Sequence, residues 1–252
     1  MGALGGASDG EPPVAAEQWW HAIEENAQVE AWFLPLPSKE PAAPRPTVIF
    51  FHGNATLIEQ CMPLVQAYHA QGFNVLLPEY RGYGRSGGNP SKANIRRDMR
   101  AFHERLLADP RVDPEKIVLH GQSVGAAVAL DLARETEPFA VILNSPFRSM
   151  AAMLWKFGIP PVFVADAYDN AAAIQETTMP VLITHGQQDR TIPFAHGQAL
   201  SESRAGLQLF GYEGDHNVQT MAEWARIRAR EAAFLRELGL IEVEAEGTDG
   251  AR

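Results

Sequence analysis

The sequence predicts an α/β fold in which helices cover both faces of a mostly parallel central sheet. From residue 47 onward, short apolar runs alternate with longer segments of helical spacing, and this alternation is typical of such sheets. A second observation is a glycine-flanked serine that stands between an apolar run and an alanine-rich run. The chain has no internal repeat and no linker after residue 46, so we predict one main domain within its 252 residues.

The domain is expected to span residues 29–240, between an N-terminal extension (1–28, partly disordered) and an acidic tail (241–252). Within the extension, Trp19–Ile23 is interpreted as a short helix, and the alternating segment 29–36 as an edge strand. Buried strands are predicted at 47–51, 74–78, 117–119, 140–144, 181–185 and 207–210. Helices are predicted at 58–71, around 95–106, directly after residue 123, and at 194–203 and 221–238.

Composition excludes several classes of partner and site. The formal net charge is −10, so duplex nucleic acid and anionic membrane surfaces are poor partners. Cys61 is the single cysteine, which leaves no internal disulfide. The first residues show no signal-peptide pattern, and no apolar run approaches the ~18 residues of a membrane span. We therefore expect a cytoplasmic protein without a transmembrane segment.

The glycine-flanked serine is Gly121-x-Ser123-x-Gly125. A chain that turns from a strand directly into a helix forces the central residue into strained backbone angles, and glycines allow the strand and helix to approach closely. Such a turn places the serine hydroxyl above a helix N-terminus, where a nucleophile belongs. The alternative is a glycine-rich turn whose serine only caps the helix. The apolar run before Ser123 and the helical run after it favour the nucleophile.

A nucleophilic serine requires a base, and the base requires an acid that fixes its tautomer. His216 is the predicted base because it lies on a loop after the last strand, bracketed by glycine and asparagine. Three acids are considered: Asp215 adjoins His216, Asp169 lies in an irregular segment, and Asp189 follows a strand by a short turn. Asp189 is favoured because it gives the chain order Ser, Asp, His and because the Ile192-Pro193 pair that follows it stiffens its loop.

The oxyanion of the reaction requires preorganised donors. One is expected to be the backbone N–H of Val124, at the start of a helix. The second is expected from the loop after strand 47–51, with Asn54 preferred and Ala55 as the alternative. His52 in the same loop is interpreted as scaffolding.

Several motifs occur together in order: His52-Gly-Asn-Ala, Tyr80-Arg-Gly-Tyr-Gly, Gly121-Gln-Ser-Val-Gly, Ser145-Pro-Phe, the His-Gly-x-x-Asp that ends at Asp189, and His216-Asn. They resemble the α/β-hydrolase superfamily, and most closely its serine-aminopeptidase-like branch of lysophospholipase-like esterases and protein depalmitoylases. The resemblance covers about residues 29–238 and implies that Ser123, Asp189 and His216 are nucleophile, acid and base. Two positions depart from the pattern, Glu79 in place of aspartate and Ala126 in place of a second glycine. The N-terminal anchor or cysteine cluster of membrane-associated members is not visible, which argues against lipidated protein substrates.

The segment 145–174 is interpreted as a short lid. Its apolar side chains either pack the lid onto the domain or line an acyl pocket, and the candidates for the pocket are Met150, Leu154, Trp155 and Phe163. A small lid suggests an open site for short to medium acyl chains.

The function predicted from these residues is a carboxylesterase-like serine hydrolase that acts on a small-molecule ester. A peptidase, an amidase or an acyl-protein thioesterase on the same triad is an alternative, and a non-catalytic binding protein is the alternative of another class. No cofactor is expected. No metal is expected either, because Asp215-His216 has no third ligand beside it in the sequence.

Overall fold

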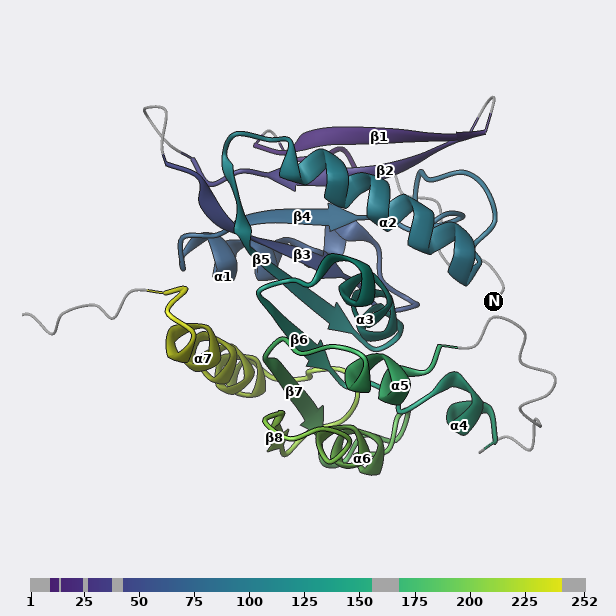
Figure 1. Cartoon of the computed structure of the whole chain (residues 1–252), viewed down its shortest axis with the longest axis vertical. Helices are drawn as coiled ribbons and strands as arrows, with labels where there is room; N and C mark the ends of the chain where they lie inside the picture. Colours follow the sequence, from purple (N-terminus) through teal and green to yellow (C-terminus); the bar gives the residue numbers. More distant parts are fainter. Residues whose placement is uncertain (1–9, 14, 25–26, 38–42, 156–167, 242–252) are drawn as a thin grey trace, which may run out of the picture.

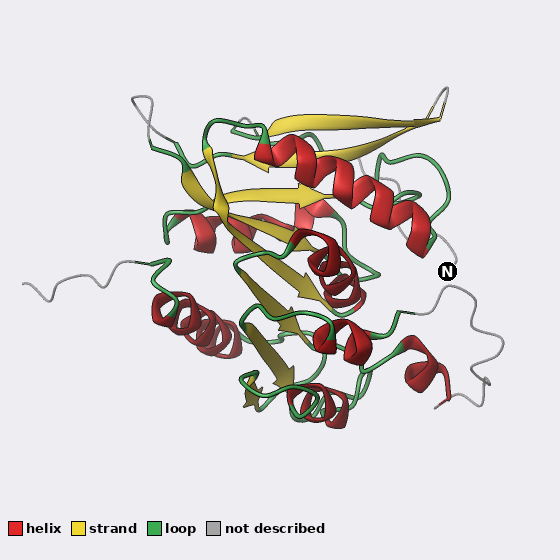
Figure 2. Ribbon diagram, in the orientation of Figure 1, coloured by secondary structure: helices red, strands yellow, loops and turns green. Residues whose placement is uncertain are grey.

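The computed structural model describes residues 10–13, 15–24, 27–37, 43–155 and 168–241. In these residues the central sheet has eight strands in the order β1-β2-β4-β3-β5-β6-β7-β8 (Figure 1). The strands are β1 (Glu17–Glu24), β2 (Ala27–Leu34), β3 (Arg45–Phe51), β4 (Asn74–Pro78), β5 (Val112–Gln122), β6 (Ala140–Asn144), β7 (Val181–Gly186) and β8 (Gln208–Tyr212). The helices are η1 (Ile58–Cys61), α1 (Met62–His69), α2 (Lys92–Leu107), α3 (Val124–Thr136), α4 (Met150–Trp155), α5 (Asn170–Gln175), α6 (Ala195–Ser201) and α7 (Met221–Glu237) (Figure 2).

Most of the sheet is parallel. Strands β4, β3, β5, β6, β7 and β8 pair in parallel, whereas β1 pairs with β2, and β2 with β4, in antiparallel fashion. The chain order reverses at β3, which lies between β4 and β5. Ligand sites of open parallel sheets form at such a switch point, beyond the carboxyl ends of the strands. The predicted fold class is confirmed.

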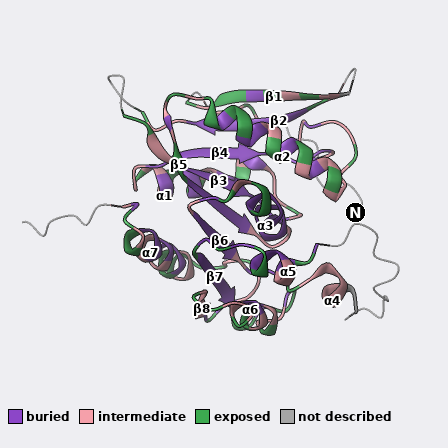
Figure 3. Cartoon of the chain, viewed as in Figure 1, coloured by how far each residue is buried: buried purple, intermediate pink, exposed green. Residues whose placement is uncertain are grey.

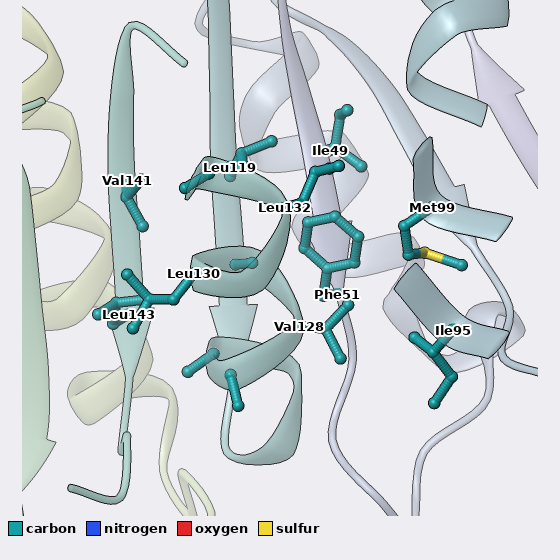
Figure 4. Packing of buried hydrophobic residues seen from close by; sticks show 14 of the residues in the cluster. Ile49, Phe51, Ile95, Met99, Leu119, Val128, Leu130, Leu132, Val141 and Leu143 are labelled. Atoms are coloured by element: carbon teal, nitrogen blue, oxygen red, sulfur yellow. The ribbon is translucent and has the colours of Figure 1, made fainter. Parts of the chain in front are cut away.

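Both faces of the sheet are buried. Along β3, Val48 and Phe50 belong to the core cluster that contains α1 and α7, and Ile49 and Phe51 to the cluster that contains α2, α3, α5 and α6. This alternation follows from the two-residue period of a strand. Figure 4 shows the second cluster, in which α3 and α2 pack their apolar side chains onto β3, β5 and β6. Burial is accordingly greatest in the central strands (Figure 3).

Two expectations for the N-terminal region are wrong. Residues Trp19–Ile23 lie in strand β1 rather than in a helix, and segment 29–36 contributes β2, which is not an edge strand because β1 covers it. The physical reason is alternation: Trp19 is buried against Phe33, at 4.8 Å between ring centroids, while Trp20 is exposed. The sheet therefore begins inside the segment predicted as an extension. Residues 1–9 and 242–252, parts of that extension and of the acidic tail, lie outside the described residues.

The predicted lid is described at its two ends only. An isolated bridge between Ser149 and Asp169 joins these ends, next to α4 and α5. Residues 156–167, with the pocket candidate Phe163, lie outside the described part of the chain. None of the helices in the described ranges is long and apolar enough to cross a membrane.

Candidate active site

The turn between β5 and α3 holds Ser123 in an unusual backbone conformation. Its φ is 55° and its ψ is −117°, a strained combination for a residue with a side chain. The turn is tight enough that a Cβ on Gly121 would collide with the backbone of Gly125 and Ala126. A Cβ on Gly125 would collide with the carbonyl oxygen of Phe51 at the end of β3. Both glycines of the motif are therefore required by contact, and the turn has the strand–serine–helix form of a nucleophile elbow.

The structure brings Ser123, His216 and Asp189 into one hydrogen-bonded chain. His216 Nε2 lies 3.1 Å from Ser123 Oγ, and His216 Nδ1 lies 2.7 Å from Asp189 Oδ2. Because a carboxylate only accepts, Nδ1–H donates to Asp189, and Nε2 is left to accept the serine hydroxyl. The three residues come from the ends of β5, β7 and β8, so the parallel sheet gathers them at its carboxyl edge.

Asp189 is held in place by its own loop. The N–H groups of Thr191 and Ile192 donate to Asp189 Oδ1 at 2.9 and 2.7 Å. Burial raises the pKa of this carboxyl group, but hydrogen bonds from His185, His216 and the Ile192 N–H outweigh burial and hold the pKa well below its usual range. Asp189 is therefore ionised at neutral pH and can stabilise a protonated His216.

The two other acids considered from the sequence have different partners. Asp215 accepts from the N–H and Nε of Arg190, both at 3.0 Å, and from the N–H of His216 at 2.8 Å. Asp169 caps α5 by accepting from the Ala172 N–H at 3.0 Å. In the structure Asp189 is the acid that meets the His216 ring.

The loop after β3 lies against Ser123, as predicted for an oxyanion site. A Cβ placed on Gly53 would be 3.8 Å from Ser123 Cβ, so the backbone that leads to Asn54 passes beside the serine. The Asn54 side chain accepts a hydrogen bond of 2.5 Å from Tyr83 Oη. Val124 is the first residue of α3, and its N–H therefore has no acceptor within the helix. Val124 directly follows Ser123 and Asn54 directly follows Gly53, and the role of both as oxyanion donors stays a proposal.

Buried polar groups brace this loop: His52, which is interpreted as scaffolding from the sequence, and Glu79, to which the sequence assigns no role. His52 is fully buried, with Nε2 2.6 Å from Glu79 Oε1 and Nδ1 2.8 Å from the Gly53 carbonyl oxygen. Glu79 also accepts from the N–H of Ile58 at 3.3 Å, and Tyr80 Oη donates to the His52 carbonyl at 2.9 Å. The sequence signal was the Tyr80 motif together with the departure at Glu79, whose longer side chain reaches the histidine.

A cavity of about 460 Å³ borders His216. Its lining residues come from the ends of β5, β6 and β8, from the η1–α1 segment and from the first turns of α7. Met150, a predicted pocket residue, packs against the α2–α3 cluster and is not among the residues that line this cavity. The side chains of Leu154 and Trp155 lie outside what the structure describes, so their assignment to an acyl pocket stays a prediction.

No cluster of three or more His, Cys, Asp or Glu side chains that could hold a metal ion occurs in the described ranges. Arg81, in the glycine-rich loop, is buried and donates to both carboxylate oxygens of Asp98 at 2.6 and 2.7 Å. Its guanidinium group therefore anchors the loop to α2.

Known proteins resemble both the sequence and the fold. A family model described as serine aminopeptidase, S33, matches residues 42–168, which is half of the chain. The chain belongs to this family of α/β-hydrolases. Among curated relatives, alpha/beta hydrolase domain-containing protein 17C of Xenopus tropicalis is 38% identical over 176 residues, which cover 69% of this chain and 56% of the relative. Human protein 17B is 35% identical over 157 residues, 62% of this chain and 54% of the relative. The matched region thus spans about half the length of these relatives.

Solved esterase structures share the fold. Esterase 2 of Thermogutta terrifontis, with butyrate bound, has a TM-score of 0.74 and 21% identity, and the match covers 92% of this chain and 97% of the esterase. The Pyrococcus furiosus esterase Pf2001 also has a TM-score of 0.74, with 19% identity and coverage of 92% and 96%. Family membership rests on the sequence match, and these structures show the same fold over 92% of the chain.

Proposed function

We propose that the protein is a serine hydrolase that cleaves carboxylic esters through an acyl-enzyme. Ser123 is the nucleophile, His216 the general base and Asp189 the acid that orients it. The observation that carries this proposal is the hydrogen-bonded chain from Ser123 to Asp189, at 3.1 and 2.7 Å, with the serine on a strained turn. Such a chain activates a hydroxyl that is otherwise a weak nucleophile at neutral pH.

In the first step Ser123 Oγ attacks the ester carbonyl carbon while its proton passes to His216 Nε2. The carbonyl oxygen becomes an oxyanion that accepts from the N–H groups of Val124 and Asn54. Ionised Asp189 stabilises the imidazolium that forms. His216 then donates its proton to the leaving alkoxide, and the carbon–oxygen bond of the ester breaks.

In the second step water attacks the acyl-enzyme. His216 accepts a proton from the water, a second oxyanion forms at the same donors, and Ser123 Oγ leaves with the proton returned by His216. The products are the carboxylic acid and the free enzyme. Both steps require an ionised Asp189, which agrees with the lowered pKa of this carboxyl group.

Short to medium acyl chains are the preferred acids in this proposal, because the segment 145–174 is short for a lid. Met150, Leu154, Trp155 and Phe163 remain the proposed acyl-contacting residues. Hydrolysis of methyl esters from acetate to laurate tests this preference. Faster turnover of the laurate ester than of the acetate and butyrate esters would contradict it.

Amide cleavage is the second candidate, since the family model is described as a serine aminopeptidase. The same triad would act, but amide cleavage depends more strongly on protonation of the leaving amine by His216. Parallel assays with ester, thioester and aminoacyl-amide reporter substrates separate these activities.

Labelling with a fluorophosphonate, followed by peptide mass spectrometry, tests the proposed nucleophile. We expect one adduct on Ser123, no adduct in Ser123→Ala, and strongly slowed labelling in His216→Ala. If the folded wild-type protein forms no adduct, the serine is not activated, and a binding role replaces the enzymatic one.

A further inference from the structure

The cavity beside His216 lies on the face of the sheet that carries α1 and α7. Cys61 and Leu64 of the η1–α1 segment form one wall, and Trp224 and Ile227 of α7 form the other. His216 lines the cavity, whereas Ser123, among the described residues, does not. Gln122, the residue before Ser123, also lines it, so the hollow adjoins the proposed base and begins beside the turn that carries the serine.

The chemistry of ester cleavage indicates which part of an ester would lie in a cavity beside His216. The reacting carbon carries four groups: Ser123 Oγ, the oxyanion, the acyl chain and the leaving oxygen. His216 must hand its proton to the leaving oxygen, so that oxygen and the alcohol portion behind it lie next to the imidazole ring. The oxyanion is directed to the Val124 and Asn54 donors. A hollow that is lined by His216 and not by Ser123 therefore suits the leaving group better than the acyl chain.

We propose that the cavity between α1 and α7 binds the alcohol portion of the ester, and that this portion is a bulky apolar group such as an arylalkyl or branched alkyl chain. This inference rests on the proposed function and specifies its substrate class. The volume of about 460 Å³ falls within the range of small-molecule sites. Phe50, Leu64, Trp224 and Ile227 give it apolar and aromatic walls.

The polar end of the cavity favours an uncharged alcohol. Arg228 lines it, but the guanidinium group lies 2.6 Å from Glu231 and 4.5 Å from the Trp224 ring centroid, so its charge is already compensated. An anionic head group would have to compete with Glu231.

The test compares esters of one acid with different alcohols. Methyl acetate and 2-phenylethyl acetate have alkoxide leaving groups of similar basicity, so their ratio of kcat/KM reports binding of the alcohol. Ile227→Phe places a ring in the cavity from α7. We expect the ratio of 2-phenylethyl to methyl acetate to fall on the order of 10-fold or more, because one methylene in a pocket already changes discrimination by about 10-fold.

Leu238→Phe is the matched control, because Leu238 is at the end of the same helix and packs on the same cluster without lining the cavity. Its ratio should equal that of the wild type. If Ile227→Phe does not fold, Trp224→Ala enlarges the cavity instead. The kcat/KM for acetates of alcohols longer than 2-phenylethanol should then rise relative to that for methyl acetate.

Two further measurements separate the outcomes. A small fluorophosphonate loses only fluoride and needs no leaving-group pocket. It should therefore label Ser123 in the Ile227→Phe variant at the wild-type rate. An unlabelled wild-type protein overturns the proposed function together with this inference. A labelled Ile227→Phe variant with an unchanged alcohol ratio overturns the inference alone. The inference is also overturned if Ile227→Phe lowers kcat/KM for methyl hexanoate relative to methyl acetate. Those esters differ only in the acid, so the cavity would then bind the acyl chain.

Discussion

The two faces of the sheet are built differently around the same site. On the α2–α3 face, a large apolar cluster extends from Ile49 to Leu143, and Val128, Leu130 and Leu132 of α3 pack into it (Figure 4). The buried Arg81–Asp98 ion pair lies at α2 on this face. On the α1–α7 face, the apolar cluster is smaller and is interrupted by the cavity and by buried polar groups. There Tyr68 Oη meets His120 Nδ1 at 2.7 Å, and Asn144 Nδ2 donates to Glu231 at 3.2 Å.

This difference follows from what each face supports. Ser123 is kept in its strained conformation by close packing of α3 against the strands, since strain persists only where the surroundings determine the backbone. In the proposed function the space next to His216 admits a substrate, and close packing there would exclude it. The rigid face therefore positions Ser123, the proposed nucleophile, and the looser face offers room for a ligand.

The largest expected effect is on catalysis at the rigid face. Ser123→Ala should lower kcat/KM for an ester by a factor on the order of 10⁴ to 10⁶, because the covalent step is lost. The free energy of unfolding should stay close to that of the wild type, since alanine keeps the Cβ. Ser201→Ala on α6 is the control and should keep full activity. Substantial activity in Ser123→Ala would show that another group performs the reaction.

The next effect is on stability. Gly125→Ala should destabilise the fold by about 3 kcal/mol or more, because its Cβ meets the Phe51 carbonyl oxygen. Gly53→Ala is the matched control, since its Cβ would find Ser123 Cβ at an ordinary 3.8 Å. Urea unfolding of both variants gives the comparison. Equal free energies of unfolding for the two variants would mean that the turn at Ser123 accommodates the added Cβ without loss of stability.

A pair of leucines compares the two faces directly. Leu130→Ala on α3 removes a fully buried side chain from the rigid cluster and should cost about 3–5 kcal/mol. Leu64→Ala on α1 should cost less, about 2–3 kcal/mol, because Leu64 already borders a cavity and makes fewer contacts to lose. Denaturant titration measures both. A larger cost for Leu64→Ala would contradict the looser packing of its face.

The smallest effect concerns pH. Burial, with a contribution from Arg228, holds the pKa of His120 well below its usual range. In the unfolded chain His120 binds a proton near pH 6.5, whereas in the native state it stays neutral at that pH. Its contribution to the free energy of unfolding is therefore present above about pH 6.5 and is lost as the pH falls. Between pH 7 and 5.5 the stability advantage of the wild type over His120→Gln should shrink by about 1 kcal/mol. An advantage that does not change with pH would mean that His120 binds a proton as readily in the native state as in the unfolded chain.

Much of the fold and of the site geometry could be predicted from the sequence because the signals are local. The strand–serine–helix turn depends on Gly121, Ser123 and Gly125, which are adjacent in the chain, and apolar runs mark the central strands. Asp189 and His216 could be predicted to approach Ser123 because parallel strands place their carboxyl ends at one edge. The helix at Trp19–Ile23 was predicted wrongly because its alternation becomes evident only when β2 pairs with it.

The sequence by itself determined the α/β class, the elbow at Ser123 and the order of the residues that meet there. The tertiary structure alone decided that β1 covers β2, that Glu79 reaches His52, and that a cavity lies between α1 and α7. These features depend on side chains far apart in the chain, whose contacts no local pattern encodes. Trp224 and Leu64 face one hollow only because both helices pack on the same side of the sheet. Short-range backbone preferences give the elements, and the packing of distant side chains gives the space between them.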